Sequence, residues 1–342
     1  TIELKEEYET LCQDVWKHNK RYFIESNPLI SDQEFDALLQ KIEDIEKEHP
    51  KWISSTSPTQ RVGESLSEGF KTIDHVKPMM SLANTYSKEE IDDFFQRLEK
   101  LTGDADFTLS CEAKMDGIAI SVRYEKGVFF RALTRGNGKR GDDVTQNVKT
   151  IARLPLVLTG ENIPEVLEVR GEIYMPLSTF SHLNTEREEL GEDAWANPRN
   201  AAAGSLKLLD PKEVKRRNLD VVFYSIAEGL DDTIIGQYES QFFMKNLGLP
   251  TLELFSLCKD FEELWDFASH VLEGRSSLDY EIDGIVIKLN SLKDQNKLSY
   301  TGKHPRWAVA YKFEAEKAQS IIRAITVQVG RTGVLTPVAE LD

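Results

Sequence analysis

The segment 111–117, Cys-Glu-Ala-Lys-Met-Asp-Gly, holds a lysine with an acidic residue two positions away on either side. Alternate side chains of an extended chain share one face, so Glu112, Lys114 and Asp116 are expected to point together. Gly117 lets the backbone turn sharply beside them. A lysine placed in this way can act as a nucleophile. The same residues also suit a solvated strand face with ion pairs, so this segment alone does not decide between the two readings.

Two later segments place further lysines at strand positions. In 280–288 an Asp-Gly pair precedes Lys288, and in 306–313 Lys312 alternates with two alanines. Small neighbours leave room for a ligand beside a lysine, while Trp307 and the other large residues of that segment are expected to face the core. Each segment alone predicts only a half-buried strand, but three lysines at such positions favour a shared ligand site.

The segment 166–174 alternates cleanly between apolar and charged residues. Glu168, Arg170 and Glu172 are expected on one face, with the apolar residues on the other. Taken singly, this pattern predicts a half-buried strand.

Hydrophobic periodicity predicts the elements that position these residues. Through 1–50, apolar residues recur at three- and four-residue spacing, which predicts two helices, the second capped by Ser31. Another helix is expected to start after Ser87. Further helices are predicted at 178–188, 201–209, 211–216, 235–247 and 261–272. Strands are predicted at 107–114, 118–124, 128–134, 166–174, 221–227, 282–289 and 307–313.

Sequential hairpins with this alternation favour antiparallel sheets over a doubly wound parallel sheet. The predicted fold class is therefore α+β, with a small N-terminal helical domain followed by antiparallel sheets with flanking helices. Two strand-like runs around 330–333 end the chain and suggest the opening of a further domain.

Composition narrows the function classes. The chain has 342 residues, which favours two or three domains, and its formal net charge is −16. Affinity for nucleic acid rests largely on neutralised phosphates, so a chain this acidic is expected to bind DNA weakly by itself. The first residues do not resemble a signal peptide, and no apolar run is long enough to span a bilayer. Three widely spaced cysteines argue against a disulfide framework or a zinc site.

Several strings together carry a family resemblance. The Lys-x-Asp-Gly strand, the strand with Glu172, the Asp-Gly-x-x-x-Lys strand and the strand with Lys312 resemble the covalent nucleotidyltransferases, which include DNA ligases, RNA ligases and mRNA capping enzymes. Longer strings resemble the bacterial NAD+-dependent DNA ligases over essentially the whole chain. They are Ser-Pro-Thr at 57–59, Met-Ser-Leu at 80–82, Thr-Arg-Gly-Asn-Gly at 134–138, the stretch 197–206, the stretch 282–288 and the stretch 330–337.

The resemblance implies that Lys114 attacks the α-phosphorus of NAD+, releases nicotinamide mononucleotide (NMN) and keeps AMP, which the full enzyme uses to seal nicked DNA. A free lysine has a pKa near 10.4, so only a few parts in ~10,000 are neutral at pH 7. Glu112 and Asp116 are expected to hold its proton. Arg199, Lys288, Lys312 or bound Mg2+ (or Mn2+) would have to outweigh them.

The resemblance also implies roles for other residues in binding NAD+. Lys288 and Lys312 would contact the α-phosphate, and Arg135 and Arg199 the phosphates or the NMN side. Glu172 would bind the adenosine ribose, while Tyr224 would stack on the base. Glu112 and the backbone of Ser81 and Leu82 would read the edge of adenine. No residue of this segment is assigned as a metal ligand.

The N-terminal helices imply NAD+ as the substrate, since in this family such a unit grips NMN. Tyr22, Asp32 and Asp36 match the family pattern. Phe35 and Phe23 depart from it, because Phe35 stands where a tyrosine is common and Phe23 where a histidine or tyrosine is common. Stacking on nicotinamide can survive these changes, whereas phenylalanine offers no side-chain hydrogen bond at either position.

The resemblance further implies a domain order and a setting. The expected domains are a helical NMN-binding domain at 1–68, a nucleotidyltransferase domain at 69–318 and the truncated start of an OB domain at 319–342. Nicked duplex DNA would be the partner of the full-length enzyme, and this segment would bind it weakly. Zn2+ would belong only to the missing C-terminal part.

The expected protein is a cytoplasmic monomer without a membrane partner, and it acts in DNA replication and repair.

Three alternatives remain. The Gly-x-Gly-x-x-Gly pattern at 136–141 matches the fingerprint of a dinucleotide-binding dehydrogenase, although the preceding strand belongs to a hairpin. An ATP-dependent ligase or capping enzyme would lack the N-terminal helices. A non-catalytic relative would have no reason to keep Lys114, Glu172, Lys288 and Lys312 together.

Overall fold

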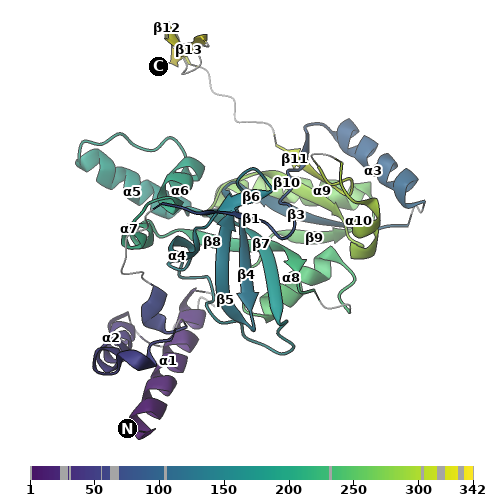
Figure 1. Cartoon of the computed structure of the whole chain (residues 1–342). Coiled ribbons are helices and arrows are strands. Elements are labelled where there is room, and N and C mark those ends of the chain that lie inside the picture. Colours follow the sequence, from purple (N-terminus) through teal and green to yellow (C-terminus); the bar gives the residue numbers. More distant parts are fainter. Residues whose placement is uncertain are drawn as a thin grey trace. The chain divides into compact units, whose positions relative to one another are not determined.

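The computed structural model describes residues 2–23, 30, 32–54, 56–61, 69–103, 106–230, 233–301, 304–313, 320–329 and 335–341. The chain divides into two compact units, Thr1–Lys312 and Phe313–Asp342. The first combines helices with antiparallel sheets and flanking helices, so the predicted α+β class is confirmed (Figure 1). Among the helices that the structure describes, none combines the length and apolar character required to span a bilayer.

Two helices form the N-terminal part, as the periodicity predicts. They are α1, Ile2–Phe23, and α2, Asp32–Glu48. Tyr8, Val15 and Ile42 are buried between them, and Phe35 packs against this cluster. The expected cap Ser31 lies outside the described residues. Short 3-10 turns follow at Pro50–Trp52 (η1) and Pro58–Arg61 (η2).

The buried carboxylate of Glu46 ties the Ser-Pro-Thr segment to both helices. It accepts hydrogen bonds from Tyr8 at 2.7 Å, Ser57 at 2.5 Å and Thr59 at 2.5 Å. A buried carboxylate is costly unless it is hydrogen-bonded, which accounts for three hydroxyl groups converging on one side chain.

A five-stranded sheet holds the lysines, in the order β2-β11-β10-β3-β9. Its strands are β2 (Ala83–Thr85), β11 (Ala308–Lys312), β10 (Ile282–Leu289), β3 (Leu109–Met115) and β9 (Phe255–Cys258). All pairs are antiparallel except β2 with β11, which is parallel.

A four-stranded antiparallel sheet follows in the order β5-β4-β7-β8. Its strands are β4 (Ile118–Glu125), β5 (Val128–Thr134), β7 (Val166–Tyr174) and β8 (Asp220–Glu228). β3 runs into β4 through Gly117, which makes a close approach, because a Cβ there would lie 2.3 Å from the carbonyl oxygen of Ile173. Lys114 therefore stands where one sheet passes into the other.

The remaining helices flank these sheets (Figure 1). α3 begins after Ser87, whose side chain accepts a hydrogen bond from the backbone N–H of Glu90, as the expected cap requires. The helices are α3 (Lys88–Thr102), α4 (Thr145–Val148), α5 (Leu177–Glu189), α6 (Pro198–Leu206), α7 (Pro211–Arg216), α8 (Gln237–Asn246), α9 (Phe261–Gly274), a 3-10 turn η3 (Arg275–Ser277) and α10 (Leu292–Leu298).

Each strand and helix that the sequence predicts in this unit is present, with ends shifted by a few residues. The largest shift is in α6, which starts three residues before the predicted 201, because Asn197 caps it through the N–H of Asn200 and Pro198 suits the first turn. The unpredicted elements are all short, namely β1 (Thr72–Asp74), β2, β6 (Arg140–Asp142), β9, α4, α10 and the 3-10 turns η1, η2 and η3.

The glycine-rich segment after β5 is a turn. Gly136 and Gly138 have φ of 55° and 89°, and a Cβ on Gly136 would lie 1.9 Å from the carbonyl oxygen of Arg140. The turn leads into β6, which pairs with β1, and no helix starts at this point. A dinucleotide fingerprint needs a strand, a glycine turn and a helix in succession, so the dehydrogenase reading is wrong.

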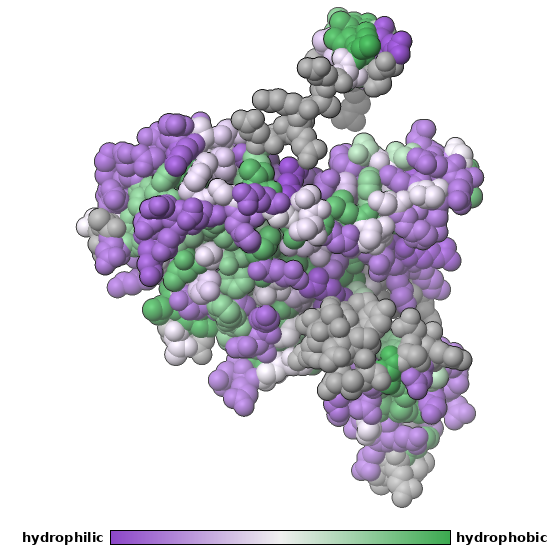
Figure 2. Space-filling model, turned by 180° about the vertical axis from the view of Figure 1, so that it is seen from behind, coloured by the Kyte–Doolittle hydropathy of each residue, from purple (hydrophilic) through white to green (hydrophobic). Residues whose placement is uncertain are grey.

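The second unit contains one antiparallel pair, β12 (Ile322–Val329) with β13 (Leu335–Leu341). This confirms the two strand-like runs expected at the end of the chain. Ile322, Ile325, Val327, Leu335 and Leu341 are exposed on it. Figure 2 shows a hydrophobic patch on this part of the chain.

Candidate functional site

The pairing of β10 brings two lysines together. Gly284 on β10 lies opposite Lys114 on β3 and opposite Lys312 on β11. Residues opposite one another in a sheet share a face, so the side chains of both lysines lie on either side of Gly284, which has no side chain. The two ammonium groups meet at one carboxylate, that of Asp283. Lys114 Nζ lies 2.9 Å from its Oδ1, and Lys312 Nζ lies 2.8 Å from its Oδ2.

Strict alternation would place Asp283 on the face opposite to Gly284. The register of β10 against β3 shifts between Ile282 and Gly284, so Asp283 falls at an irregularity that turns its side chain to the lysines. Burial acts to raise the pKa of Asp283, but the hydrogen bonds from Lys312 and Lys114 outweigh it and lower the pKa.

The partner of Lys114 differs from the sequence expectation. Glu112 and Asp116 were the expected counter-ions, yet Glu112 pairs with Lys288 and Asp116 accepts a 2.8 Å bond from Arg199. The reason is that β3 is buried on both sides up to Ala113, so Glu112 turns inward while Asp116 lies beyond the strand.

Glu112 and Lys288 form a buried ion pair, with 2% and 7% of their side chains exposed. Burial raises the pKa of Glu112, and Lys288 opposes this rise. Lys288 Nζ also lies 5.2 Å from the centre of the Tyr224 ring and 3.4 Å from the Tyr224 carbonyl oxygen. Among the described residues, none donates a hydrogen bond to Glu112 Oε2.

These groups line a cavity of about 190 Å³ between the two sheets. Its wall includes predicted residues from both sheets, namely Leu82, Glu112, Lys114, Arg135, Glu172, Tyr224 and Lys288. An adjoining hollow of about 640 Å³ shares Leu82, Lys114, Arg135 and Glu172 and adds Ser81, Arg199 and Lys312. The structure thus gathers these predicted residues around one continuous space with Lys114 at the junction.

Phe35, one of the predicted NMN contacts, is partly buried and packs against the core of the two N-terminal helices. The side chains of Tyr22, Asp32 and Asp36 lie outside the described residues.

The carboxyl group of Glu172 has a raised pKa. Burial raises its pKa to about 8, with Lys114 and Arg199 opposing the rise and Asp116 and Asp283 adding to it. The Glu172 side chain is half-buried and lines the cavity, so it is accessible to a ligand. Without a ligand, most of it is expected to be protonated at pH 7.

Replacing Glu172 with glutamine is expected to stabilise the ligand-free protein increasingly as pH rises. The folded state keeps the carboxyl proton up to about pH 8, whereas the unfolded chain loses it near 4.5. Unfolding therefore becomes easier for the wild type as pH rises across this window, and glutamine removes the effect. Melting temperatures at pH 5, 6.5 and 8 measure it. A constant difference between the two proteins would contradict the raised pKa.

Several pocket residues escaped the sequence reasoning. Asp283 was visible in the Asp-Gly pair, but the sequence analysis gave it no role, and strict alternation would place it on the face opposite to Gly284. Trp307 was expected in the core and instead lines the cavity, because it stands just before the first residue of β11, Ala308. Arg170, which also lines the cavity, donates a 2.8 Å hydrogen bond to the carbonyl of Lys77. Its charged face on β7 was the signal that could have found it.

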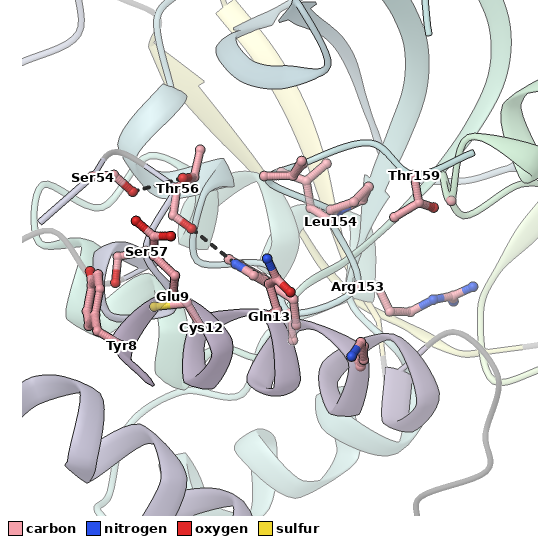
Figure 3. A pocket seen from close by; sticks show the side chains of 16 residues that line it. Tyr8, Glu9, Cys12, Gln13, Ser54, Thr56, Ser57, Arg153, Leu154 and Thr159 are labelled. Carbon is pink, nitrogen blue, oxygen red and sulfur yellow. Dashed lines mark hydrogen bonds between the residues drawn. The ribbon is translucent and has the colours of Figure 1, made fainter. Parts of the chain in front are cut away.

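A separate cavity of about 530 Å³ lies between α1 and the loop 152–159 (Figure 3). Tyr8, Cys12 and Gln13 line it from the helix, and Leu154 and Thr159 from the loop. Trp16 and Thr56 also line it, and Trp16 donates a 3.1 Å hydrogen bond to the Thr56 carbonyl. None of the predicted site residues lines this cavity.

Comparison with known proteins identifies the family of this chain. Residues 1–63 match a family described as the DNA ligase-like N-terminal NAD+-binding domain, and residues 67–316 match the NAD-dependent DNA ligase adenylation domain. A DNA ligase of Protochlamydia amoebophila is 58% identical over 99% of this chain and 51% of its own length. DNA ligases of Bacteroides fragilis and Thermotoga maritima are 46% and 44% identical over 99% of the chain, and the matches cover 51% and 49% of those proteins.

The chain spans about half the length of these curated relatives. A solved structure, the ATP-dependent DNA ligase from bacteriophage T7 in complex with ATP, aligns with a TM-score of 0.35 at 14% identity, over 75% of this chain and 79% of that one. That likeness is too remote to add to the assignment. On the family matches and the close relatives, this chain belongs to the NAD-dependent DNA ligases and comprises their N-terminal NAD+-binding domain and their adenylation domain.

Proposed function

We propose that this chain performs the first step of ligation, in which Lys114 takes AMP from NAD+. Lys114 Nζ attacks the α-phosphorus, the bond from that phosphorus to the oxygen bridging to NMN breaks, and NMN leaves with the electron pair. The product is a phosphoramidate, and the Nζ proton passes to solvent. The observation that carries the proposal is the place of Lys114 at the junction of the cavity and the adjoining hollow, next to Lys312.

The attack requires Lys114 to leave Asp283. In the ligand-free site one carboxylate serves two ammonium groups, so Lys312 remains as its partner when Lys114 turns to the phosphate. Lys312, Lys288 and Arg199 supply positive charge near the α-phosphate, where negative charge builds up in the transition state.

The cavity of about 190 Å³ is proposed to hold the adenosine part. Glu112 Oε2 supplies an acceptor at its buried end for the amino group of adenine. The backbone of Ser81 and Leu82 meets the edge of the base, and Tyr224 stacks on its face. Glu172 binds the ribose hydroxyls.

The phosphate and NMN contacts are proposed from the resemblance and from position. Arg135 and Arg199 face the hollow of about 640 Å³, which leads outward from Lys114, and suit the phosphates. Asp116 holds Arg199 in place at 2.8 Å. Tyr22, Asp32, Phe35 and Asp36 of the helices are proposed to take the NMN half.

Mg2+ is proposed as the metal. Within the described part of the chain, no group of three or more His, Cys, Asp or Glu side chains could hold a metal. Mg2+ usually keeps several waters and binds one or two carboxylates together with substrate phosphates, so the single carboxylates here fit a metal that arrives with NAD+. When bound, it would neutralise phosphate charge.

The whole enzyme is proposed to seal nicks in duplex DNA during replication and repair, as a monomer in the cytoplasm. We assign 1–68 to NMN binding, 69–318 to adenylation and 319–342 to the start of an OB domain. The exposed apolar residues of β12 and β13 support the last assignment, because a hairpin with an apolar face needs further strands to bury it.

Intact mass tests the proposal. The chain is incubated with Mg2+ and either NAD+ or ATP, beside a Lys114→Ala control. A gain of one adenylyl group (~329 Da) with NAD+ alone, absent in the variant, is expected for a lysine nucleophile. A gain with ATP, or a gain that survives in Lys114→Ala, would overturn the proposal, as would no gain at all.

Weak nick sealing by this chain alone is a further expectation. Its net charge of −16 opposes binding to phosphates, and binding should weaken further with salt. A gel assay with adenylated chain and a nicked duplex measures the joined product. Efficient sealing at about 150 mM salt would contradict the weak DNA binding inferred from the charge.

A further inference from the structure

Two segments form the outer rim of the proposed base cavity. Met79, Met80 and Leu82 contribute one side, and Tyr300, Pro305 and Trp307 the other. The segments continue as neighbours, because β2 and β11 pair in parallel and Thr85 donates a 3.0 Å hydrogen bond to the Ala310 carbonyl. The rim therefore lies just before two strands that are already joined.

His304 joins the two segments across the rim. Its Nδ1 lies 2.9 Å from the carbonyl oxygen of Ser81 and 3.4 Å from the Ser81 hydroxyl. A carbonyl only accepts hydrogen bonds, so Nδ1 carries the proton and donates. The His304 backbone is itself held by Thr301, whose hydroxyl accepts from the His304 N–H at 3.0 Å and whose N–H donates to the His304 carbonyl at 2.7 Å.

The Ser81 carbonyl and the Leu82 N–H belong to one planar peptide unit, so fixing one fixes the direction of the other. We propose that His304 is a positioning residue that orients the Ser81–Leu82 peptide for recognition of the adenine base. His304 reaches the ligand only through this peptide. The inference rests on the proposed function, because it requires NAD+ to place its base in this cavity.

Loss of the hydrogen bond from His304 is expected to weaken NAD+ binding more than it slows the chemical step. Lys114 and Asp283 have no contact with His304, so the rate of the chemical step is set elsewhere. One hydrogen bond contributes a net free energy of roughly 0.5–1.5 kcal/mol, which corresponds to a change in affinity of about two- to twelvefold. Loss of the His304 donor is expected to raise the KM for NAD+ by such a factor and to leave kcat within about twofold.

Two conservative variants separate positioning from mere packing. In His304→Asn the amide nitrogen, when turned to Ser81, lies about where Nδ1 lies, since both atoms are bonded to Cγ. In His304→Gln the corresponding nitrogen stands one bond further out, like Nε2. We expect asparagine to restore most of the wild-type KM, and glutamine and alanine to leave it raised. His270→Ala on the exposed face of α9 is the matched control and should behave as wild type.

Initial rates of self-adenylation over a series of NAD+ concentrations give KM and kcat, with melting temperature as a check of folding. A raised KM in His304→Ala with rescue by asparagine supports the inference. Wild-type KM in His304→Ala overturns it while adenylation itself stands, and so does an equal KM increase in all three variants. If the wild type gains no AMP, the proposed function fails and this inference fails with it.

Discussion

Lys114→Arg is expected to abolish the gain of AMP from NAD+ while the protein stays folded. Arginine keeps the positive charge and can still pair with Asp283, so the ion pair with 2.9 Å separation in the wild type has a substitute. Its guanidinium is not deprotonated in proteins, and it therefore offers no free electron pair for attack on phosphorus. Intact mass after incubation with NAD+ and Mg2+ measures the loss, which should reach the detection limit.

Lys100→Arg is the matched control, because Lys100 is exposed at the end of α3. It should gain AMP at the wild-type rate. The melting temperatures of both variants should stay close to that of the wild type. A mass gain in Lys114→Arg would show that another residue is the nucleophile, and peptide mapping of the modified chain would identify it.

Lys288→Met is expected to be the most destabilising single change in the pocket. It removes one partner of a buried pair and leaves Glu112, with 2% of its side chain exposed, without its counter-ion. Breaking such a pair typically costs about 3–5 kcal/mol, because the remaining charge is buried without compensation. Denaturant unfolding followed by circular dichroism measures the free energy of unfolding, and self-adenylation is expected to fall as well.

The pH dependence gives a second check on Lys288→Met. Burial already raises the pKa of Glu112, and without Lys288 nothing opposes that rise. The folded variant then holds a proton that the unfolded chain releases near the ordinary glutamate pKa of 4.5. Stability is therefore lost progressively as pH rises above that value, so the deficit should be larger at pH 8 than at pH 5.

A double variant, Glu112→Gln with Lys288→Met, provides the control. Removing both charges leaves no unpaired ion, and replacing a whole buried pair is often close to neutral for stability. The double variant should recover most of the lost free energy of unfolding without recovering adenylation. Equal stability of the single and double variants would mean that Lys288 contributes through its packing.

The elements followed from local patterns. Strands were predicted at β3, β7 and β10 from alternation, and helices at α1 and α2 from helical spacing. Such predictions succeed because the period of apolar residues, which sets the face that a strand or helix can bury, is contained within the segment itself. The short strands β1, β2, β6 and β9 gave no such signal. They have three or four residues, and pairing with a longer neighbour defines them.

The family and its chemistry were also within reach of the sequence. The Lys-x-Asp-Gly segment, the later lysines and the N-terminal helices identified it, and the family matches confirmed it. The net charge of −16 also follows from composition alone, and the expectation of weak DNA binding rests on it. These properties depend on residue type and order along the chain.

Only the tertiary structure decided which charges meet. Adjacent carboxylates in the sequence were the expected partners of Lys114, but Asp283, 169 residues away, takes that place, while Glu112 turns inward to Lys288. Ion pairing depends on distances of a few ångströms between strands, and a register shift at Asp283 reversed the face that alternation predicts. Spacing in the sequence determines on which face of its own strand a side chain lies. Its neighbours on other strands depend on how the strands align, and that alignment exists only once the chain has folded.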